Sequence, residues 1–209
     1  MLSNRIAQLT PPPRRVPLPV ACSAMLGLTG GIGAAFLIMG MLFVWLFVAD
    51  PAAPLWVSFV LIFPVVGAAL FATATVRGLR HVALLRYGEV ASARAVSEQA
   101  TNTTVNDQPV IKYVYEFQAG DGRAYQGASR AISSEEIGDE VGEPVLYLPS
   151  NPVVSILVDA LPLRSTLDVD DDGQWVSYES VWPVVWCGLA WLGIVAHALY
   201  GLVRLFGGL

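Results

Sequence analysis

The stretch that decides the fold is residues 55–76, which read LWVSFVLIFPVVGAALFATATV. It contains no charged side chain, and about 20 helical residues are enough to cross the roughly 30 Å hydrocarbon core of a bilayer. Two further stretches, 16–49 and 181–203, also lack charge. Because a segment in lipid must satisfy its own backbone hydrogen bonds, the sequence predicts three transmembrane helices.

The composition of the whole chain agrees with a membrane protein. Of its 209 residues 55% are hydrophobic and 14% are charged, whereas soluble domains carry about 25% charged residues. A net charge of −5 argues against a nucleic-acid-binding protein, which is usually basic. The two cysteines, Cys22 and Cys187, are too few for a disulfide framework or a zinc site.

The helical parts lie at the two ends of the chain. We expect residues 1–87 to form an N-terminal tail and a helical hairpin with spans at about 20–49 and 55–76, and residues 181–209 to form a third span and a short tail. Pro51 and Pro54 predict the turn within the hairpin, and Pro64 predicts a kink in the second span.

Arginine placement predicts the orientation. Six arginines flank the hairpin, three before the first span and three after the second, while the turn between the spans carries only Asp50. Because Lys and Arg near helix ends stay on the cytoplasmic side, we expect a multi-pass membrane protein with a cytoplasmic N-terminus and middle segment. The six are Arg5, Arg14, Arg15, Arg77, Arg80 and Arg86.

The middle segment, 88–160, reads as a small soluble β domain. Ile111, Tyr113, Tyr115 and Phe117 alternate with Lys112, Val114, Glu116 and Gln118, which is typical of a half-buried strand. A glycine-containing turn at 119–122 then predicts a hairpin. Five strands are expected, at 88–96, 111–118, 123–131, 145–148 and 153–158, with a polar connection at 98–107. The fold class is therefore an α+β membrane protein, with three transmembrane helices and one antiparallel β-barrel-like soluble domain.

Several short stretches of this domain resemble a known family. They are Gly88-Glu89-Val90, the Tyr113–Phe117 strand, residues 121–127, and the ending at 141–152, which closes with Tyr147-Leu148-Pro149-Ser150-Asn151-Pro152. Together, residues 88–157 resemble the bacterial domain-of-unknown-function family 3592. Leu148 stands where that family often has an acidic residue. The resemblance implies a small β-barrel flanked by membrane helices, a location in the bacterial inner (plasma) membrane, and no activity.

The sequence gives no support for an enzyme. His81 lies at a membrane boundary, His197 lies in the third span, and neither cysteine is in the β domain, so a nucleophile with an adjacent base is not expected there. The acidic pairs at 135–136 and 139–140 read as a solvated loop. We assign no catalytic, cofactor-binding or metal-binding residue and no cofactor.

An acidic segment, 161–180, leaves two interpretations open. Asp168, Asp170, Asp172 and Glu179, with Gly173 at the sixth position, match the spacing of a calcium-binding loop. Pro162 lies where such a loop needs an entering helix, and the simpler interpretation is an acidic linker.

Two features of the spans also leave alternatives. Gly27, Gly31 and Ala35 recur at intervals of four, which predicts close packing within the chain or a homo-oligomer through the first helix. His197 is interpreted as a packing residue rather than a proton relay.

The expected partners are the lipid bilayer and another protein or a second copy, and no nucleic acid. We therefore predict a non-enzymatic interaction or assembly module. The alternatives are a calcium-responsive protein that uses the loop at 168–179, and an accessory subunit of a membrane protease, scaffold or transporter.

Overall fold

The computed structural model describes residues 5–44, 59–105, 108–131, 142–161 and 165–206. The chain divides into two compact units. The β unit comprises Met1–Val20 and Arg80–Glu179, and the helical unit comprises Ala21–Leu79 and Ser180–Leu209. The β unit thus takes in more of the chain than residues 88–160.

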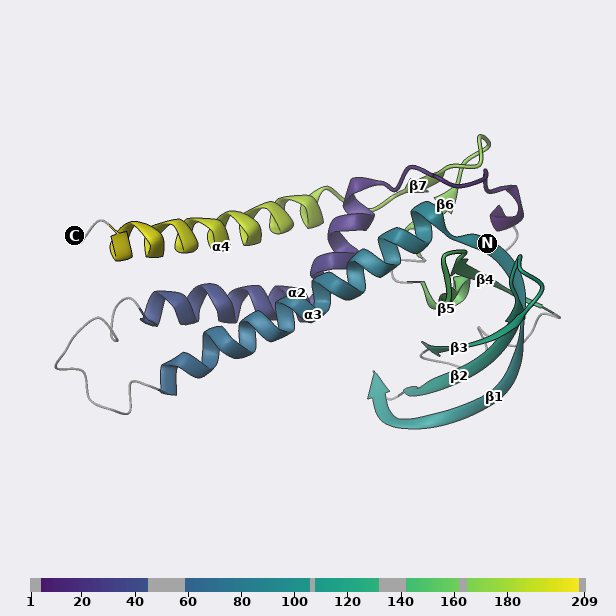
Figure 1. Ribbon diagram of the computed structural model, residues 1–209, viewed down its shortest axis with the longest axis horizontal. Helices are drawn as coiled ribbons and strands as arrows, with labels where there is room; N and C mark the ends of the chain where they lie inside the picture. Colours follow the sequence, from purple (N-terminus) through teal and green to yellow (C-terminus); the bar gives the residue numbers. More distant parts are fainter. Residues whose placement is uncertain (1–4, 45–58, 106–107, 132–141, 162–164, 207–209) are drawn as a thin grey trace. The chain divides into compact units, whose positions relative to one another are not determined.

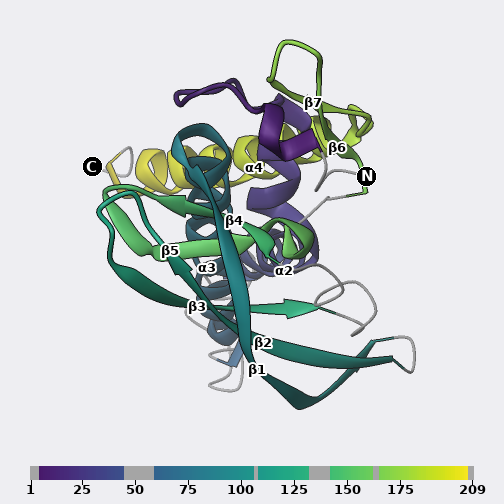
Figure 2. The ribbon, with the colours of Figure 1, turned by 90° about the vertical axis from the view of Figure 1, so that its right-hand side faces the viewer.

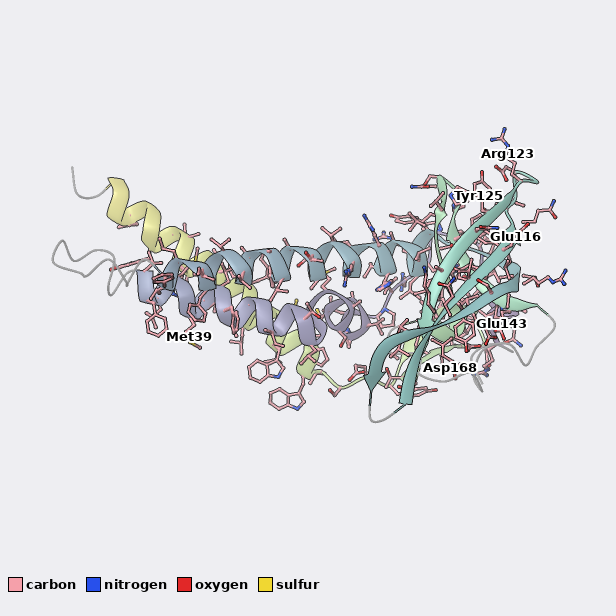
Figure 3. All side chains as sticks on the ribbon, turned by 90° about the horizontal axis from the view of Figure 1, so that it is seen from below. Met39, Glu116, Arg123, Tyr125, Glu143 and Asp168 are labelled. Atoms are coloured by element: carbon pink, nitrogen blue, oxygen red, sulfur yellow. The ribbon has the colours of Figure 1, made fainter. Side chains whose placement is uncertain are left out.

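Three long helices supply the helical unit: α2 (Leu18–Phe43), the first part of α3 (Ile62–Tyr87) and α4 (Trp182–Phe206). The segments long and apolar enough to span a membrane are Leu18–Phe43, Phe59–Tyr87 and Trp182–Gly201. Figure 3 shows side chains made mainly of carbon along these helices. Three helices able to span a membrane are therefore confirmed.

The second helix ends later than expected. Its predicted end was residue 76, before the first arginine, but α3 continues to Tyr87. Arginine is a good helix former, so Arg77 and Arg80 do not interrupt the backbone ladder. The helix ends where the Gly88 N–H donates to the Leu84 carbonyl. The predicted turn at 50–54 lies outside the described residues.

Helices α2 and α3 pack through glycines. A Cβ added at Gly33 would lie 2.5 Å from the backbone nitrogen of Phe71 and 3.0 Å from the carbonyl oxygen of Gly67. Glycine therefore allows the two backbones to approach closely. Ala34, Phe71 and Ala190 form a buried cluster that joins α4 to this pair.

The small-residue stripe predicted from sequence is not the one that packs. A Cβ at Gly27 or Gly31 would have no atom within 4 Å, and Ala35 is exposed. The stripe at 27, 31 and 35 thus forms no close helix contact within the part of the chain that the structure describes. The spacing identified a helix face of small residues but could not distinguish it from the neighbouring face that contains Gly33.

One described helix contains a break in its helical geometry. Gly27 breaks the helical geometry of α2, with φ 44° and ψ −167°. Pro64 is only the third residue of α3, where a backbone N–H has no partner within the helix in any case. Pro64 thus lies in the first turn of α3, and residues 55–58 of the predicted second span fall outside the described residues, so the kink predicted at Pro64 stays a prediction.

The β unit contains one five-stranded antiparallel sheet, which curls until it nearly closes (Figures 1 and 2). The strand order is β3-β2-β1-β4-β5. This confirms the predicted antiparallel, barrel-like arrangement. The strands are β1 (Glu89–Val105), β2 (Gln108–Gln118), β3 (Ala124–Ala131), β4 (Glu143–Leu148) and β5 (Asn151–Leu157).

Strand β1 is longer than predicted. Residues 98–105, expected to be part of a polar connection, continue the strand because they pair with β2 as far as Val105 opposite Gln108. Their side chains do not alternate between polar and apolar, so the pattern contained no strand signal. A bulge at Val96 interrupts the register between Ala95 and Ser97.

Strand β4 separates two apolar clusters. Val145 and Tyr147 face the sheet interior with Tyr113, Tyr115 and Phe117, all at most 3% exposed. Leu146 faces the other way and joins Leu84, Leu85 and Trp175 in a second cluster. The alternation predicted for 111–118 is confirmed, and its aromatic face forms the core.

The acidic segment is partly folded rather than a plain linker. β6 (Leu167–Val169) and β7 (Trp175–Ser177) form an antiparallel hairpin. The N-terminal segment contacts this hairpin and contributes Ile6, in the short helix η1 (Ile6–Gln8), to the second cluster. A second short helix, η5 (Val158–Ala160), follows β5.

Candidate functional site

The residues of the calcium-loop pattern lie in and around the turn of the β6–β7 hairpin. The Gly173 N–H donates to the Asp170 carbonyl and closes a β-turn, for which Asp is favoured at the first position. Gly173 has φ +71°, and a Cβ there would lie 2.5 Å from the Gln8 carbonyl oxygen. The backbone conformation and the close contact with Gln8 thus explain why glycine occupies position 173, without any bound metal.

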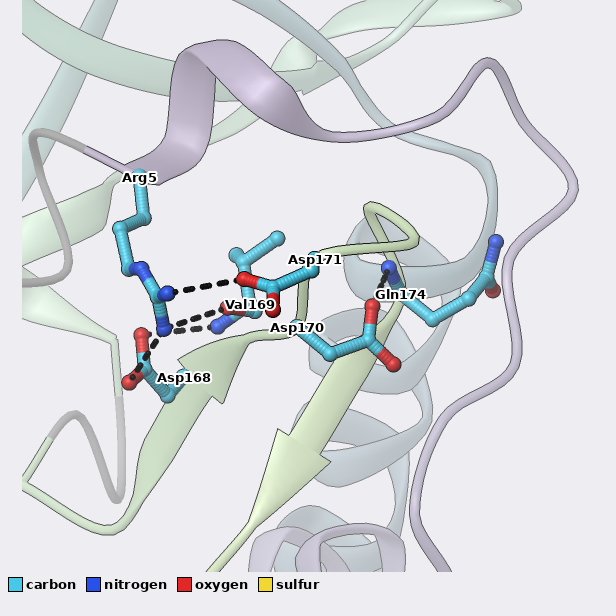
Figure 4. A network of polar contacts seen from close by, with 6 residues as sticks. All are labelled: Arg5, Asp168, Val169, Asp170, Asp171 and Gln174. Carbon is cyan, nitrogen blue, oxygen red and sulfur yellow. Dashed lines mark hydrogen bonds and ion pairs between the residues drawn. The ribbon is translucent and has the colours of Figure 1, made fainter.

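Three acidic side chains of the hairpin, Asp168, Asp170 and Asp171, already have protein partners (Figure 4). Arg5 donates through Nη1 to Asp168 Oδ2 at 3.3 Å and to the Val169 carbonyl at 3.0 Å, and through Nη2 to Asp171 Oδ1 at 3.2 Å. Asp170 Oδ1 accepts the Gln174 N–H at 2.7 Å. A cation at Asp168 would therefore have to compete with a guanidinium.

The other two residues of the pattern do not complete a site. Asp172 is exposed, and Glu179 accepts a hydrogen bond from Thr166 Oγ1 at 3.2 Å. Among the described residues, no group of three or more His, Cys, Asp or Glu side chains could hold a metal ion. Strands, not helices, flank the turn. The structure thus does not bring the four residues into one coordination sphere.

We expect calcium to leave the stability of the chain unchanged. A sensor loop binds calcium at 10⁻⁷–10⁻⁵ M, so millimolar calcium would stabilise the folded state by about 2.7 kcal/mol or more. The measurement is the melting temperature of the full chain in detergent with calcium or with chelator. A calcium-dependent rise that is lost in Asp168→Asn would restore the calcium hypothesis.

The C-terminal end of α3 is capped by distant parts of the β unit. Trp175 Nε1 donates to the Leu85 carbonyl at 2.8 Å, and the Arg14 backbone N–H donates to the Arg86 carbonyl at 2.8 Å. The Arg14 guanidinium, which is 5% exposed, donates to the Gly88 carbonyl at 2.7 Å. These bonds satisfy carbonyls that an uncapped helix end leaves unpaired.

Arg14 is a structural residue that sequence reasoning identified only as a flanking charge. Burial lowers the pKa of its guanidinium, and attraction to Glu89 opposes that effect. A buried cation at a helix C-terminus interacts favourably with the helix dipole. Its local sequence, with Arg15 beside it, contains no signal that distinguishes the buried arginine from the exposed one.

Tyr147 connects the start of β1 to the β2–β3 turn. Its hydroxyl donates to Glu89 Oε2 at 2.7 Å and accepts the Gly120 N–H at 2.9 Å. Burial, followed by the hydrogen bond to Glu89, raises the pKa of Tyr147. Tyr147 therefore has a structural role in the β unit.

The β2–β3 turn is held by Asp121. Its carboxylate accepts the Arg123 N–H at 3.0 Å and the Tyr125 hydroxyl at 2.8 Å. These two hydrogen bonds, the Arg123 bond first, lower the pKa of Asp121, and the contact with Asp121 raises the pKa of Tyr125. Figure 3 shows Arg123 and Tyr125 at this end of the sheet.

We expect the β unit to lose stability above pH 10. Burial raises the pKa of Tyr113, Tyr115 and Tyr147 above their ordinary value of 10.0. A tyrosine whose pKa is higher in the folded state stabilises that state while its hydroxyl is protonated. This contribution is complete below the unfolded-state pKa and is lost as the pH rises through the folded-state pKa. Phenolate absorbance and circular dichroism, recorded together, test this.

Ionisation of these tyrosine hydroxyls should coincide with loss of β structure. In Tyr147→Phe, one tyrosine fewer should ionise when the β unit unfolds. Complete tyrosine ionisation while the circular dichroism spectrum stays native would contradict the expectation.

One edge of β1 stands out as a surface that could bind another chain. Strand β1 lies between β2 and β4, and β4 pairs with it only at residues 89–93. On the side that faces β4, the described strands include no partner for β1 at residues 94–99. Figure 2 shows β1 and β2 extending together beyond β4. A groove of about 1000 Å³ lies beside this edge, lined by residues that include Arg94, Val96, Glu116 and Glu143.

The remaining candidates from sequence lie elsewhere or outside the described residues. His197 Nδ1 lies 2.8 Å from the Gly193 carbonyl one turn earlier, so its ring N–H donates within α4. The acidic pairs at 135–136 and 139–140, and Pro162, fall in segments that the structure does not describe. Tyr113, Tyr115 and Tyr147 are buried and Tyr125 is half-buried, so none offers a fully exposed aromatic surface.

Comparison of the chain with protein-family models, with curated proteins and with solved structures found no match in any of the three.

Proposed function

We propose that this chain is an integral protein of the bacterial inner membrane whose β unit lies in the cytoplasm and acts as a non-enzymatic interaction module. The observation that carries the proposal is the edge of β1 at 94–99, which continues beyond β4 without a strand partner among the described residues. An open strand edge presents backbone donors and acceptors to which an extended segment of another polypeptide can add.

The membrane orientation is supported by the arginines that the fold leaves exposed. Arg5 and Arg14 are engaged in hydrogen bonds within the β unit. Arg15 is exposed shortly before α2, and three further arginines are exposed in the C-terminal part of α3: Arg77, Arg80 and Arg86. Arginines in these positions favour the cytoplasmic side. Trp182 and Trp186, 61% and 58% exposed at the start of α4, suit the bilayer interface.

Several polar side chains of the β unit have structural roles, which supports a non-enzymatic module. The hydroxyl of Tyr147 and the carboxylates of Glu89 and Asp121 hold one turn, and Asp168 pairs with Arg5. These side chains stabilise the fold through bonds to one another. We also propose, from the stretches at 88–157, kinship with domain-of-unknown-function family 3592.

Site-specific photo-cross-linking in native membranes tests the interaction. A photoreactive phenylalanine analogue at Val96, 54% exposed beside the open edge, should give an adduct of one defined mass. The matched control is Tyr178, which is 76% exposed after β7 and away from that edge. Identical adducts at both positions, or none at Val96, would contradict the proposal.

An accessory subunit of a membrane protease, scaffold or transporter is a specific form of the same proposal. It predicts that the protein joined to Val96 is itself an integral membrane protein that co-purifies in fixed ratio. A soluble protein in the adduct would instead favour recruitment from the cytoplasm.

A further inference from the structure

Helix α2 changes direction at Gly27, within the helical unit. Gly27 has φ 44° and ψ −167°, which interrupts the helical geometry between residues 21–26 and residues 28–43. In Figures 1 and 3 the first turns of α2 run across the direction that the rest of α2 shares with α3, and Figure 3 views these turns nearly end-on. Residues 21–26 are called the crosswise segment below.

Contacts with α3 give the level at which α2 turns. A Cβ added at Gly30, in the part of α2 that runs along α3, would lie 3.2 Å from Ala74 Cβ. A Cβ added at Gly78 would collide with backbone atoms of Met25, in the crosswise segment. The crosswise segment therefore passes α3 at Gly78, which is two residues, or about 3 Å along the helix axis, beyond Val76.

This level coincides with the end of the apolar part of α3. Residues 62–76 of α3 contain no charged side chain, and the next residue, Arg77, is exposed. An arginine that directly follows an apolar stretch can keep its stem on apolar groups while its guanidinium reaches the phosphate layer of a bilayer. If residues 62–76 lie in the hydrocarbon core, Gly78 and the crosswise segment lie at the level of the lipid headgroups.

The composition of the crosswise segment suits this layer. It reads ACSAML and carries no charge, and apart from the buried Cys22 its side chains are half-buried. Apolar side chains that stay partly open at the level of Arg77 are stabilised by the boundary between headgroups and acyl chains rather than by water. Beyond Gly27 the apolar surface continues with Leu28 and Ile32, which are 82% and 44% exposed.

We propose that residues 21–26 form an in-plane segment that binds the headgroup layer of a phospholipid bilayer, and that the membrane-crossing part of α2 begins at Leu28. The apolar side chains of the segment contact the upper parts of the acyl chains, and Arg77 beside it donates to lipid phosphate groups. The proposal needs the three spans, but it is independent of the β1 edge and of the side of the membrane on which the β unit lies.

The test measures the depth of nitroxide labels on the full chain in vesicles of phosphatidylethanolamine and phosphatidylglycerol. A genetically encoded ketone amino acid carries each label, so the native cysteines stay in place. Oxygen and a water-soluble nickel chelate, which partition oppositely between lipid and water, report the depth. The segment pair is Ser23 and Leu26, both half-buried, and the matched α3 pair is Val76 and Leu79, which are 49% and 50% exposed.

The two pairs have the same spacing of three residues but different expected results. The α3 pair lies on a continuous helix, so its labels should differ in depth by up to about 4.5 Å, with the Leu79 label nearer to water. The labels of the segment pair should lie at one depth, between those of the α3 pair and the aqueous phase or level with them. Ala21 and Ala24, also half-buried, provide a second segment pair where a label at the first pair unfolds the chain.

Labels at Leu28 and Ile32 check the membrane premise separately, because both should lie deeper than the segment pair and Ile32 deeper than Leu28. A depth difference within the segment pair as large as that within the α3 pair would mean that α2 crosses the bilayer without a turn, and would overturn the proposal. Segment labels that react with the nickel chelate as fully as a label in free solution would also overturn it. A Leu28 label in water would overturn the premise and the proposal together.

Discussion

Replacing Tyr115 with alanine is expected to destabilise the β unit by about 3–5 kcal/mol, the range for removing a large aromatic side chain from a core. Tyr115 is 1% exposed and packs beside Phe117, with ring centroids 6.3 Å apart. Its ring also covers Gly127 of β3, where a Cβ would collide with it. The Tyr115→Ala substitution would therefore leave a cavity in the core of the sheet, where β2 and β3 lie side by side.

A matched variant separates packing from hydrogen bonding at this position. Tyr115→Phe keeps the ring and removes only the hydroxyl, which lies 3.1 Å from Ser155 Oγ of β5. Loss of one hydrogen bond is expected to destabilise by about 0.5–1.5 kcal/mol. Hydrogen exchange of β2 peptides, measured by mass spectrometry on the full chain, gives both opening free energies. Equal effects of the two variants would contradict a packed core at Tyr115.

Replacing Gly33 with alanine is expected to destabilise the helical unit by about 1–3 kcal/mol, as overpacking does. The added methyl group would press on backbone atoms of Phe71 and Gly67 in α3, which cannot move aside as a side-chain tip can. Separation of α2 from α3 would relieve the clash. The melting temperature of the full chain in mild detergent should fall.

Gly31→Ala is the control for this variant. Gly31 lies on the same helix, and a Cβ there would have no atom within 4 Å. Alanine favours the helix over glycine by about 1 kcal/mol, so this variant should match or exceed the wild type in stability. A larger loss in Gly31→Ala than in Gly33→Ala would show that α2 presents a different face to α3.

The sequence predicted those parts of the fold that local patterns determine. Long apolar stretches specify helices in lipid without reference to distant residues, and strict alternation at 111–118 specified which face of β2 is buried. The curled antiparallel sheet followed from several short strands separated by turns. Each of these predictions needed only local sequence: the length of an apolar stretch, the period of apolar residues or the residues of a turn.

The features that sequence reasoning missed depend on contacts between distant segments. A span that is apolar on every side carries no mark of the face that packs, so Gly27 and Gly31 could not be distinguished from Gly33. Residues 98–105 form a strand because β2 lies beside them. Arg14 is buried because Gly88 and Thr10 supply carbonyl acceptors.

The candidate sites depend on distant contacts in the same way. The calcium pattern at 168–179 was visible in the sequence, but the arginine that pairs with Asp168 comes from residue 5. The edge of β1 that has no partner among the described strands also required knowledge of where β4 stops pairing.

The proposed membrane arrangement is tested most directly by trypsin accessibility of Arg123, which lies exposed in the β2–β3 turn. We expect trypsin added to intact spheroplasts to leave the chain uncut there, and the same trypsin to cleave it in inverted inner-membrane vesicles. Cleavage at Arg123 in intact spheroplasts would place the β unit on the opposite side of the membrane and contradict the proposed arrangement.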